Sequence, residues 1–395
     1  RIELFVYMRY KAALVAWSLV GCSGRASEEQ RAQTQCKAEA FDWLYDVRQW
    51  SPPGYHCICL WPVNSSGAAE LYVWLWKGGH KEAKPSSWIL HGNLSVAAFR
   101  RDLRKRVSMK KQKRWSFLPW ALLDTSGNEI KHLKGKSGVA MVFEGGRWVW
   151  PGIREGFRRK VSVAGSDLTM TTLTLNPLAF TIDGFLGSSD AKHIINMARP
   201  RLKPAAVVLA DGSADKGSEL AEARTCSEAW MDRNSDAVLK LVGRRTADLT
   251  RAPLELQEDF RVLQYKPGQQ FVEHTDYYEV EDFQHQPSIL RELQNGRNWL
   301  VTVYLYLSTV QKGGQTYFPS TYGKPLPSAT GVCTGPSVKP KRGRALMFYS
   351  LHPDASTNPS SMHGGCKVGK GVKYTINIWT FNQASVDSNL SRLEL

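Results

Sequence analysis

The sequence has few acidic residues for its size. Its 395 residues include 36 Asp and Glu against 52 Lys and Arg, a formal net charge of +16. The deficit lies mainly before residue 171, where 14 acidic residues accompany 27 basic ones. The densest basic run, Arg100–Arg114, can attract nucleic acid, anionic lipid or an acidic polymer. No nucleic-acid-binding motif surrounds this run, so we expect a solvated basic helix or loop and predict no nucleic-acid partner.

Long apolar runs are scarce, and only one segment is a candidate for entering a membrane. Ala12–Val20 follows Arg9 and Lys11 and precedes four small residues. This order is typical of a secretory signal, and the run is short for a bilayer span. We expect residues 1–25 to be a signal, or alternatively a short anchor or a buried helix. The protein is accordingly expected in the endoplasmic reticulum lumen or secretory pathway, with membrane contact through this segment alone.

Cysteine is sparse, with seven in the chain. Cys57 and Cys59 have no second pair at zinc-site spacing, so no zinc site is predicted there. If Cys22 leaves with a signal, six remain, an even number compatible with disulfides in an oxidising compartment. Because Cys333 and Cys366 flank a predicted strand, we expect a bridge between them that pins the loop carrying His363.

The length indicates two domains, or one domain with a long extension. Residues 38–163 alternate aromatic-rich segments, such as Leu71–Trp76, with Gly and Pro turns, which predicts a small β-rich or α+β domain. We recognise no catalytic constellation in it. Residues 172–383 are predicted to form the second domain, and 384–395 a C-terminal tail.

Residues 172–383 contain two predicted amphipathic helices. One starts at Ser188 and ends before Pro200, and the other spans 236–250. Apolar strands are predicted at 178–182, 261–265, 299–307, 344–349 and 374–381. We expect two segments, 205–224 and 279–298, to be mobile over the site.

Three side chains in this half have the pattern of metal ligands. His274 and Asp276 lie two residues apart in a strand-like segment, so both point the same way. His363 is expected in a loop between two later strands. Two histidines and one carboxylate form the facial triad of non-haem Fe(II) oxygenases. Lys373, ten residues beyond His363, suits the far carboxylate of a dicarboxylic co-substrate such as 2-oxoglutarate.

Four motifs follow one another in this half of the chain. They are Tyr-x-x-Gly-Gln-x-Phe-x-x-His-x-Asp (Tyr265–Asp276), Gly-Gly-x-Thr-x-Phe-Pro (Gly313–Pro319), Lys-Pro-x-x-Gly-x-Ala-Leu-Met-Phe-Tyr-Ser (Lys339–Ser350), and His-Gly-Gly-Cys from His363 with its later lysine. With them, residues 172–383 resemble the catalytic domain of the prolyl 4-hydroxylase family of Fe(II) and 2-oxoglutarate dioxygenases.

This resemblance implies a mainly β protein with flanking helices, built on a double-stranded β-helix or jelly-roll. It implies that His274, Asp276 and His363 bind iron and are catalytic. Lys373 would pair with the 2-oxoglutarate carboxylate, and Tyr265 and Thr316 would hydrogen-bond it. The implied cofactors are Fe(II), 2-oxoglutarate and O2 as co-substrates, and ascorbate. The implied reaction is hydroxylation of peptidyl proline, with the 4-position favoured, in a proline-rich peptide or protein.

Two positions depart from the family pattern and bear on the substrate. Trp299 stands where many relatives have an arginine that faces the peptide, and Lys367 stands where proline is usual. Tyr277, Tyr278 and Trp299 are candidate walls of a groove for a proline-rich peptide, or else barrel-packing residues. The same chemistry on lysyl residues or nucleobases is one alternative. A non-catalytic peptide-binding relative is another, and the intact ligand set argues against it.

Overall fold

The computed structural model describes residues 30–36, 54–65, 68–76, 86–92, 94–106, 118–205, 207–208, 214–215, 226–284, 286–329 and 331–385. The expected signal or anchor at 1–25, most of the expected loop at 205–224 and most of the tail at 384–395 lie outside these residues. Within them, no helix combines the length and the apolar character needed to cross a membrane.

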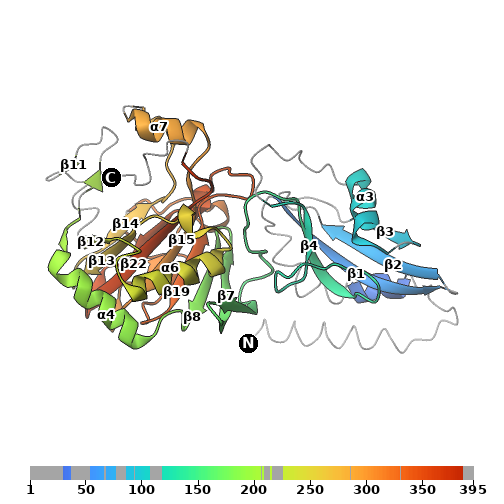
Figure 1. The fold of residues 1–395 in the computed structure, drawn as a ribbon, viewed down its shortest axis with the longest axis horizontal. Helices are drawn as coiled ribbons and strands as arrows, with labels where there is room; N and C mark the ends of the chain where they lie inside the picture. The colour runs from blue at the N-terminus through green and yellow to red at the C-terminus, as the bar shows by residue number, and fades with distance from the viewer. Residues whose placement is uncertain are drawn as a thin grey trace.

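The C-terminal part of the fold is built on a nine-stranded sheet (Figure 1). Its strands, in spatial order, are β6 (Arg158–Val163), β7 (Ser166–Leu175), β8 (Leu178–Asp183), β19 (Ala345–Tyr349), β15 (Trp299–Tyr306), β22 (Lys373–Phe381), β13 (Phe260–Tyr265), β12 (Ser227–Met231) and β9 (Lys203–Pro204). The two central strands, β15 and β22, are buried along their whole length. The apolar strands expected from the sequence are therefore found, with ends that differ by at most one residue.

A four-stranded sheet completes the catalytic fold. Its order is β14 (Phe271–His274), β20 (His363–Gly365), β17 (Thr316–Tyr317) and β18 (Ser337–Val338). Together the two sheets form the double-stranded β-helix, which confirms the expected fold class. His363, expected in a loop, instead begins β20, directly opposite His274 in the register. A three-residue strand is too short to show a periodic pattern in the sequence.

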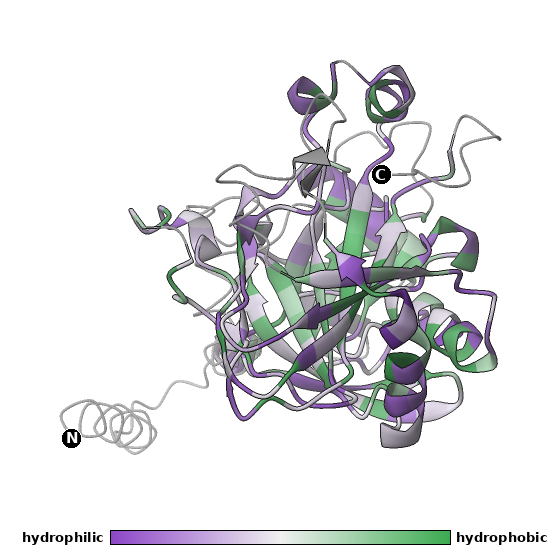
Figure 2. Cartoon of the chain, turned by 90° about the vertical axis from the view of Figure 1, so that its left-hand side faces the viewer, coloured by the Kyte–Doolittle hydropathy of each residue, from purple (hydrophilic) through white to green (hydrophobic). Residues whose placement is uncertain are grey.

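Two helices cover one face of the nine-stranded sheet, and both were expected. They are α4 (Ser188–Ala198) and α6 (Ala237–Thr250). The Asp236 carboxylate caps α6 by accepting hydrogen bonds from the backbone N–H groups of Val238 and Leu239. Apolar side chains of both helices share one core with the strands (Figure 2). The opposite face of the sheet is therefore left for the four-stranded sheet and the site between them.

Shorter elements connect these layers. They are β10 (Val207–Val208), β11 (Ala214–Asp215), β16 (Lys312–Gly313), β21 (Val368–Lys370), α7 (Pro287–Gln294) and the 3-10 turns η1 (Arg199–Arg201), η2 (Leu254–Leu256), η3 (Val280–Phe283), η4 (Thr321–Gly323) and η5 (Pro359–Ser361). η3 and α7 make up most of the insertion at 279–298, and α7 stands apart from the sheets at the top of Figure 1.

The N-terminal part is a five-stranded antiparallel sheet with one described helix on it. The strand order is β3 (Ser86–His91), β2 (Ala68–Trp76), β1 (Tyr55–Ser65), β5 (Gly138–Phe143) and β4 (Ala121–Leu123), and α3 (Val96–Arg106) lies between β3 and β4 in sequence. Phe99 and Leu103 of α3 are fully buried against one face of this sheet. A disulfide between Cys36 and Cys59 ties the helical residues 30–36 to β1.

The two parts share one continuous hydrophobic core. The Trp150 indole N–H donates to the Leu249 carbonyl oxygen at the end of α6 (2.7 Å), and its backbone N–H donates to the Tyr349 hydroxyl on β19 (3.2 Å). The Arg251 guanidinium lies over the rings of Trp148 and Trp150, 4.2 and 4.3 Å from their centres. β6, within the range expected for the N-terminal domain, pairs with β7 and extends the catalytic sheet. Aromatic packing thus fixes the N-terminal part against the catalytic part.

The expected bridge between Cys333 and Cys366 is present. Cys366 lies directly after β20, so the bridge ties the segment that follows Phe318 to the strand carrying His363. Among the described cysteines, Cys57 and Cys226 are unpaired and buried.

Candidate metal centre and lysine pocket

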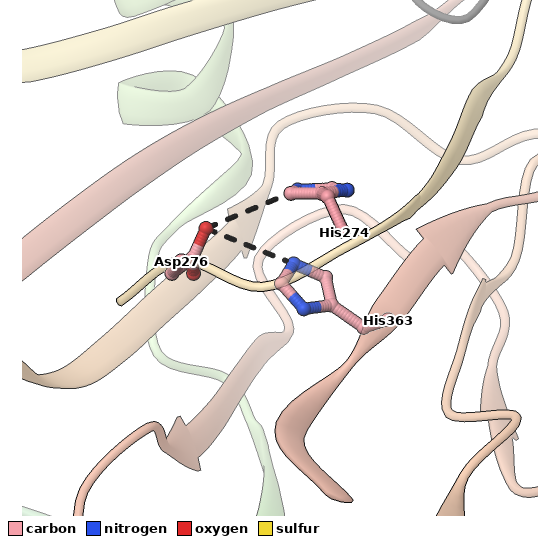
Figure 3. A group of neighbouring side chains, drawn as sticks. All are labelled: His274, Asp276 and His363. Atoms are coloured by element: carbon pink, nitrogen blue, oxygen red, sulfur yellow. Dashed lines mark ion pairs between the residues drawn. The ribbon is translucent and has the colours of Figure 1, made fainter. Parts of the chain in front are cut away.

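His274, Asp276 and His363 meet where β14 and β20 pair (Figure 3). The Nε2 atom of each histidine lies 3.9 Å from Asp276 Oδ1. One potential ligand atom from each of the three residues lies within 4.8 Å of the others. In the described part of the chain, no other group of three such side chains comes together.

Backbone carbonyl groups orient both imidazole rings in the same way. Nδ1 of His274 lies 3.0 Å from the Val272 carbonyl oxygen, and Nδ1 of His363 lies 3.0 Å from the Ser361 carbonyl oxygen. A carbonyl oxygen can only accept, so each Nδ1 carries the proton and donates. The Nε2 lone pairs then point toward Asp276, which is the tautomer that a metal-binding histidine requires.

The donor set and its exposure fit a catalytic iron site. Two neutral imidazole nitrogens and one carboxylate suit Fe(II) with positions left for other ligands. The side chains of Asp276 and His363 are 4% and 6% exposed, whereas that of His274 is 25% exposed. Phe271 stacks on His274 with ring centres 3.8 Å apart, and Phe348 lies 4.6 Å from His363. The cluster is therefore walled by apolar rings and opens on the side of His274.

A residue that the sequence did not single out orients the carboxylate. The Thr302 hydroxyl on β15 donates a 2.6 Å hydrogen bond to Asp276 Oδ2. Thr302 is fully buried. This bond leaves Oδ1 directed at the two histidines, so Asp276 presents one oxygen to a metal.

Lys373 begins β22 and is 1% exposed. Its Nζ lies over three tyrosine rings, 5.1 Å from the centre of Tyr265, 5.3 Å from Tyr304 and 5.9 Å from Tyr306. Within the described residues, no carboxylate forms an ion pair with Lys373. Burial lowers the pKa of Lys373 to about 7, because the charged ammonium loses its hydration. The pocket is therefore a buried amine enclosed by three tyrosine rings.

The lysine pocket lies next to the metal cluster along β20. A side-chain carbon at Gly365, two residues beyond His363, would come within 3.6 Å of Lys373 Nζ. The absence of a side chain at Gly365 leaves a short path between His363 and the lysine. Gly365 therefore places the lysine amine beside β20, two residues beyond His363.

Thr316 and Tyr265 both line this pocket. Thr316 pairs with Gly365 in the register and accepts a 2.8 Å hydrogen bond from the Tyr306 hydroxyl. Tyr265 lies beside Lys373 on the neighbouring strand. Tyr304 and Tyr306 were missed from the sequence, although their alternation along β15 places both on the same face of the sheet.

Trp299 joins an aromatic cluster on the same face of the sheet. It stacks on Trp379 with ring centres 4.6 Å apart, and Tyr278 lies 4.6 Å from Trp299. Tyr277 instead packs in the core that the helices cover.

Glu258 lies near this aromatic cluster and is 8% exposed. Neither of its carboxylate oxygens has a hydrogen-bond partner in the described residues. Burial raises the pKa of Glu258 to about 8.

Comparisons with known proteins agree with this chemistry. Residues 260–381, which contain the three clustered side chains and Lys373, match the 2OG-Fe(II) oxygenase superfamily. The chain is 34% identical over 213 residues to probable prolyl 4-hydroxylase 3 of Arabidopsis thaliana, covering 52% of this chain and 70% of the relative. It is also 34% identical to prolyl 4-hydroxylase 5 of that plant, covering 69% of it.

Solved structures with a similar fold include two prolyl hydroxylases. A viral collagen prolyl hydroxylase from Paramecium Bursaria Chlorella virus-1 is 22% identical with a TM-score of 0.37, covering 51% of this chain and 95% of that one. A prolyl-4-hydroxylase of Pseudomonas putida is 16% identical with a TM-score of 0.33, covering 52% and 93%.

The protein is a 2OG-Fe(II) oxygenase. Within that superfamily the chain belongs to the prolyl 4-hydroxylase family, as its identity to the plant enzymes over more than two thirds of their length shows. Membership implies Fe(II) as the metal cofactor and 2-oxoglutarate and dioxygen as co-substrates.

Proposed function

We propose that the protein hydroxylates peptidyl proline, at the 4-position, and converts 2-oxoglutarate to succinate and CO2. The observation that carries this proposal is the juxtaposition of the His274, Asp276 and His363 cluster with the buried cation Lys373. Relatives named prolyl 4-hydroxylases support proline as the substrate residue.

In this proposal His274 and His363 bind Fe(II) through Nε2, and Asp276 binds it through Oδ1. When bound, iron supplies the activation of dioxygen and the oxidation of a substrate C–H bond. The chain's own contribution is geometry: the Val272 and Ser361 carbonyl groups hold the rings, and apolar side chains limit the access of water.

Lys373 binds the far carboxylate of 2-oxoglutarate as a point charge. Folding already desolvates the lysine, so the carboxylate gains the full attraction of a buried ammonium while only its own desolvation opposes binding. Thr316 and Tyr265, which line the same pocket, are proposed to hydrogen-bond that carboxylate. The pocket then selects a dicarboxylate over a monocarboxylate of similar size, since a monocarboxylate would leave the ammonium unpaired.

The peptide is proposed to bind at the exposed edge of the aromatic cluster of Tyr278, Trp299 and Trp379, because Trp299 and Trp379 are themselves only 5% and 3% exposed. Trp230, 38% exposed and 6.1 Å from Trp379 by ring centres, continues this cluster to the surface. Aromatic surfaces suit a polyproline II segment, which has no internal hydrogen bonds and presents flat rings. η3 and α7 follow Tyr278 in sequence and are proposed to close over the bound peptide.

The remaining assignments are proposals of the same kind. Residues 38–163 form an accessory domain and 172–383 the dioxygenase domain, with 384–395 as a tail. The endoplasmic reticulum lumen or secretory pathway fits the two disulfides and the leader-like sequence of residues 1–25. Ascorbate is proposed as the reductant that keeps iron in the Fe(II) state.

The test is succinate formation by the purified chain with Fe(II), ascorbate and 2-oxoglutarate, with and without proline-rich peptides. Peptide-stimulated turnover, with one added oxygen on proline by mass spectrometry, is expected. Oxygen added to lysine, or turnover stimulated only by nucleic acid, would overturn the assignment of proline as the substrate residue.

A matched pair of variants tests the metal assignment. Asp276→Ala is expected to lose iron binding and turnover, whereas Glu255→Ala, at an exposed acid on η2, should keep both. Peptide binding without turnover in the unmodified chain would instead indicate a non-catalytic peptide-binding relative.

A further inference from the structure

α3 uses two of its arginines for packing within the N-terminal part. The Arg100 guanidinium lies 5.1 Å from the centre of the Trp120 ring, and that of Arg106 lies 4.6 Å from the Trp88 ring. Arg106 also forms an ion pair with Asp102 at 3.3 Å. These contacts, with Phe99 and Leu103, hold the helix on the sheet.

Three other basic residues of α3 have no such role. Arg101, Arg104 and Lys105 are exposed, and their spacing of three and four residues places them on one side of the helix. None of them forms an ion pair with any described residue. Burial lowers the pKa of Arg100, and the positive charge of Arg104 lowers it further. The two guanidinium groups therefore repel each other.

A second basic segment lies beside this helix. Leu133 is buried in the same small core as Phe99 and Leu103, and an isolated bridge joins His132 to Ser95 just before α3. Around Leu133 the lysines at 131, 134 and 136 are exposed, and none is ion-paired within the described part of the chain. We call the six side chains the basic face: Arg101, Arg104, Lys105, Lys131, Lys134 and Lys136.

The basic face fits a flexible acidic chain. The six positive charges outnumber the two acids beside them in sequence, Asp102 and Glu129, and an anionic partner relieves their repulsion. A membrane-surface helix would need its apolar side free for lipid, but Phe99 and Leu103 are buried in the protein. No large hydrophobic side chain is exposed in the described N-terminal part, so the face offers no aromatic platform for unpaired bases.

The location of the basic face relative to the metal cluster also supports docking of a substrate segment. α3 lies on the N-terminal sheet, to the right of the catalytic strands in Figure 1. Arg147, which follows β5, donates hydrogen bonds to the Asn382 carbonyl oxygen (3.2 Å) and the Gln383 side chain (2.8 Å) beyond β22. A segment bound at the basic face is thus held at a fixed separation from the metal cluster, which raises the local concentration of a tethered proline stretch.

We propose that the basic face docks an acidic segment of the protein substrate, separate in sequence from the proline that is hydroxylated. This proposal rests on the proposed function, because it requires the substrate to be a polypeptide. It assigns the N-terminal part the recognition of substrates rich in Asp and Glu. The expected gain is a lower KM with kcat unchanged, because docking affects binding and not the chemistry.

The experiment compares three peptides: a proline-rich peptide alone, the same peptide with an Asp/Glu tract on a Gly/Ser linker, and one with an Asn/Gln tract. The acidic tract should lower KM about tenfold at low salt, and this gain should shrink as salt rises. Arg101→Gln, Arg104→Gln and Lys105→Gln combined should remove the gain and leave the untagged peptide unaffected. The matched control is Lys192→Gln, Lys240→Gln and Arg244→Gln, exposed residues of α4 and α6.

Equal KM values for the acidic and neutral tracts would overturn docking and leave the proposed function intact. Fluorescence anisotropy with a labelled Asp/Glu tract lacking proline separates the two proposals. Specific binding of that tract without hydroxylation of any peptide would sink the proposed function alone. If the α3 variant fails to fold, replacing the three lysines at 131, 134 and 136 by Gln tests the same face. Tighter binding of duplex DNA or phosphatidylserine vesicles than of the acidic tract would also overturn the proposal.

Discussion

The Thr302 hydroxyl donates a 2.6 Å hydrogen bond to Asp276 Oδ2, although the two residues are 26 positions apart. This bond joins the central strand β15 to the segment that follows β14, and so fixes the carboxylate relative to both histidines. Thr302 is therefore a positioning residue for the proposed metal centre and not a ligand.

Replacing Thr302 with Val, which keeps the shape and removes the hydroxyl, should weaken Fe(II) binding about 10–100-fold. Thr302→Ser keeps the donor and should restore most of the affinity. Competition with a chromogenic chelator measures the affinity, and a thermal melt checks the fold. Equal affinity in Val and Ser variants with a lowered melting temperature would show a purely structural role.

The lowered pKa of Lys373 predicts how the affinity for 2-oxoglutarate depends on pH. Its pKa of about 7 in the ligand-free protein means that the ammonium form declines as pH rises above 7. The dicarboxylate needs that form, so its Kd should rise about tenfold between pH 7.5 and 8.5. Calorimetric titration with Mn(II) in place of Fe(II) tests this prediction, and Lys373→Met should bind weakly at every pH. A constant Kd from pH 6.5 to 8.5 would contradict it.

The same group makes a separate prediction for stability. Unfolding returns Lys373 to a pKa near 10.5, so between about pH 7 and 10.5 the unfolded chain binds more protons than the folded one. The contribution of Lys373 to the free energy of unfolding should therefore rise with pH across that window. In Lys373→Met this pH-dependent contribution should be absent from urea denaturation curves.

The contribution of Glu258 to the free energy of unfolding should fall as pH rises, opposite to that of Lys373. Its pKa is raised from 4.5 to about 8, mainly by burial, so the folded chain holds a proton that the unfolded chain releases. Its contribution to stability should fall as pH rises from about 4.5 to 8, by about 1.4 kcal/mol for each unit of pKa shift. Glu258→Gln removes this loss and should gain stability over the wild type as pH rises. The control is Glu255→Gln, an exposed acid nearby, which should leave the pH profile unchanged.

Much of the catalytic sheet could be predicted because its central strands are short apolar runs, rich in β-branched and aromatic residues, that are buried on both faces. The histidines, Asp276 and Lys373 could be singled out because their residue types and spacing carry the chemistry themselves. Thr302 could not, because its role depends on where β15 lies relative to Asp276, and threonine is common in strands for reasons of packing. The environment of Lys373 was likewise hidden until the register placed Tyr265 beside it.

The boundary between the two parts was harder to place for a related reason. β6 was not predicted, because its first three residues are basic, although exposed and buried residues alternate along its whole length in the structure. The sheet that it joins is decided by long-range pairing with β7. Similarly, the pattern of the Trp148–Trp150 segment shows an apolar stretch but not that it packs on α6 and β19.

Because the two parts share one core, a single substitution at their junction should destabilise both. Trp150 is 3% exposed and makes both hydrogen bonds to the catalytic part described above. Trp150→Ala should lower the free energy of unfolding by about 3–5 kcal/mol, from lost packing and a residual cavity. Trp230→Ala, at a partly exposed tryptophan of the catalytic part, should cost less than about 1 kcal/mol. Urea denaturation followed by far-UV circular dichroism and by tryptophan fluorescence should give one coincident transition in the wild type and in both variants. Two separate transitions in the wild type would show that the parts fold independently and that the shared core does not couple them.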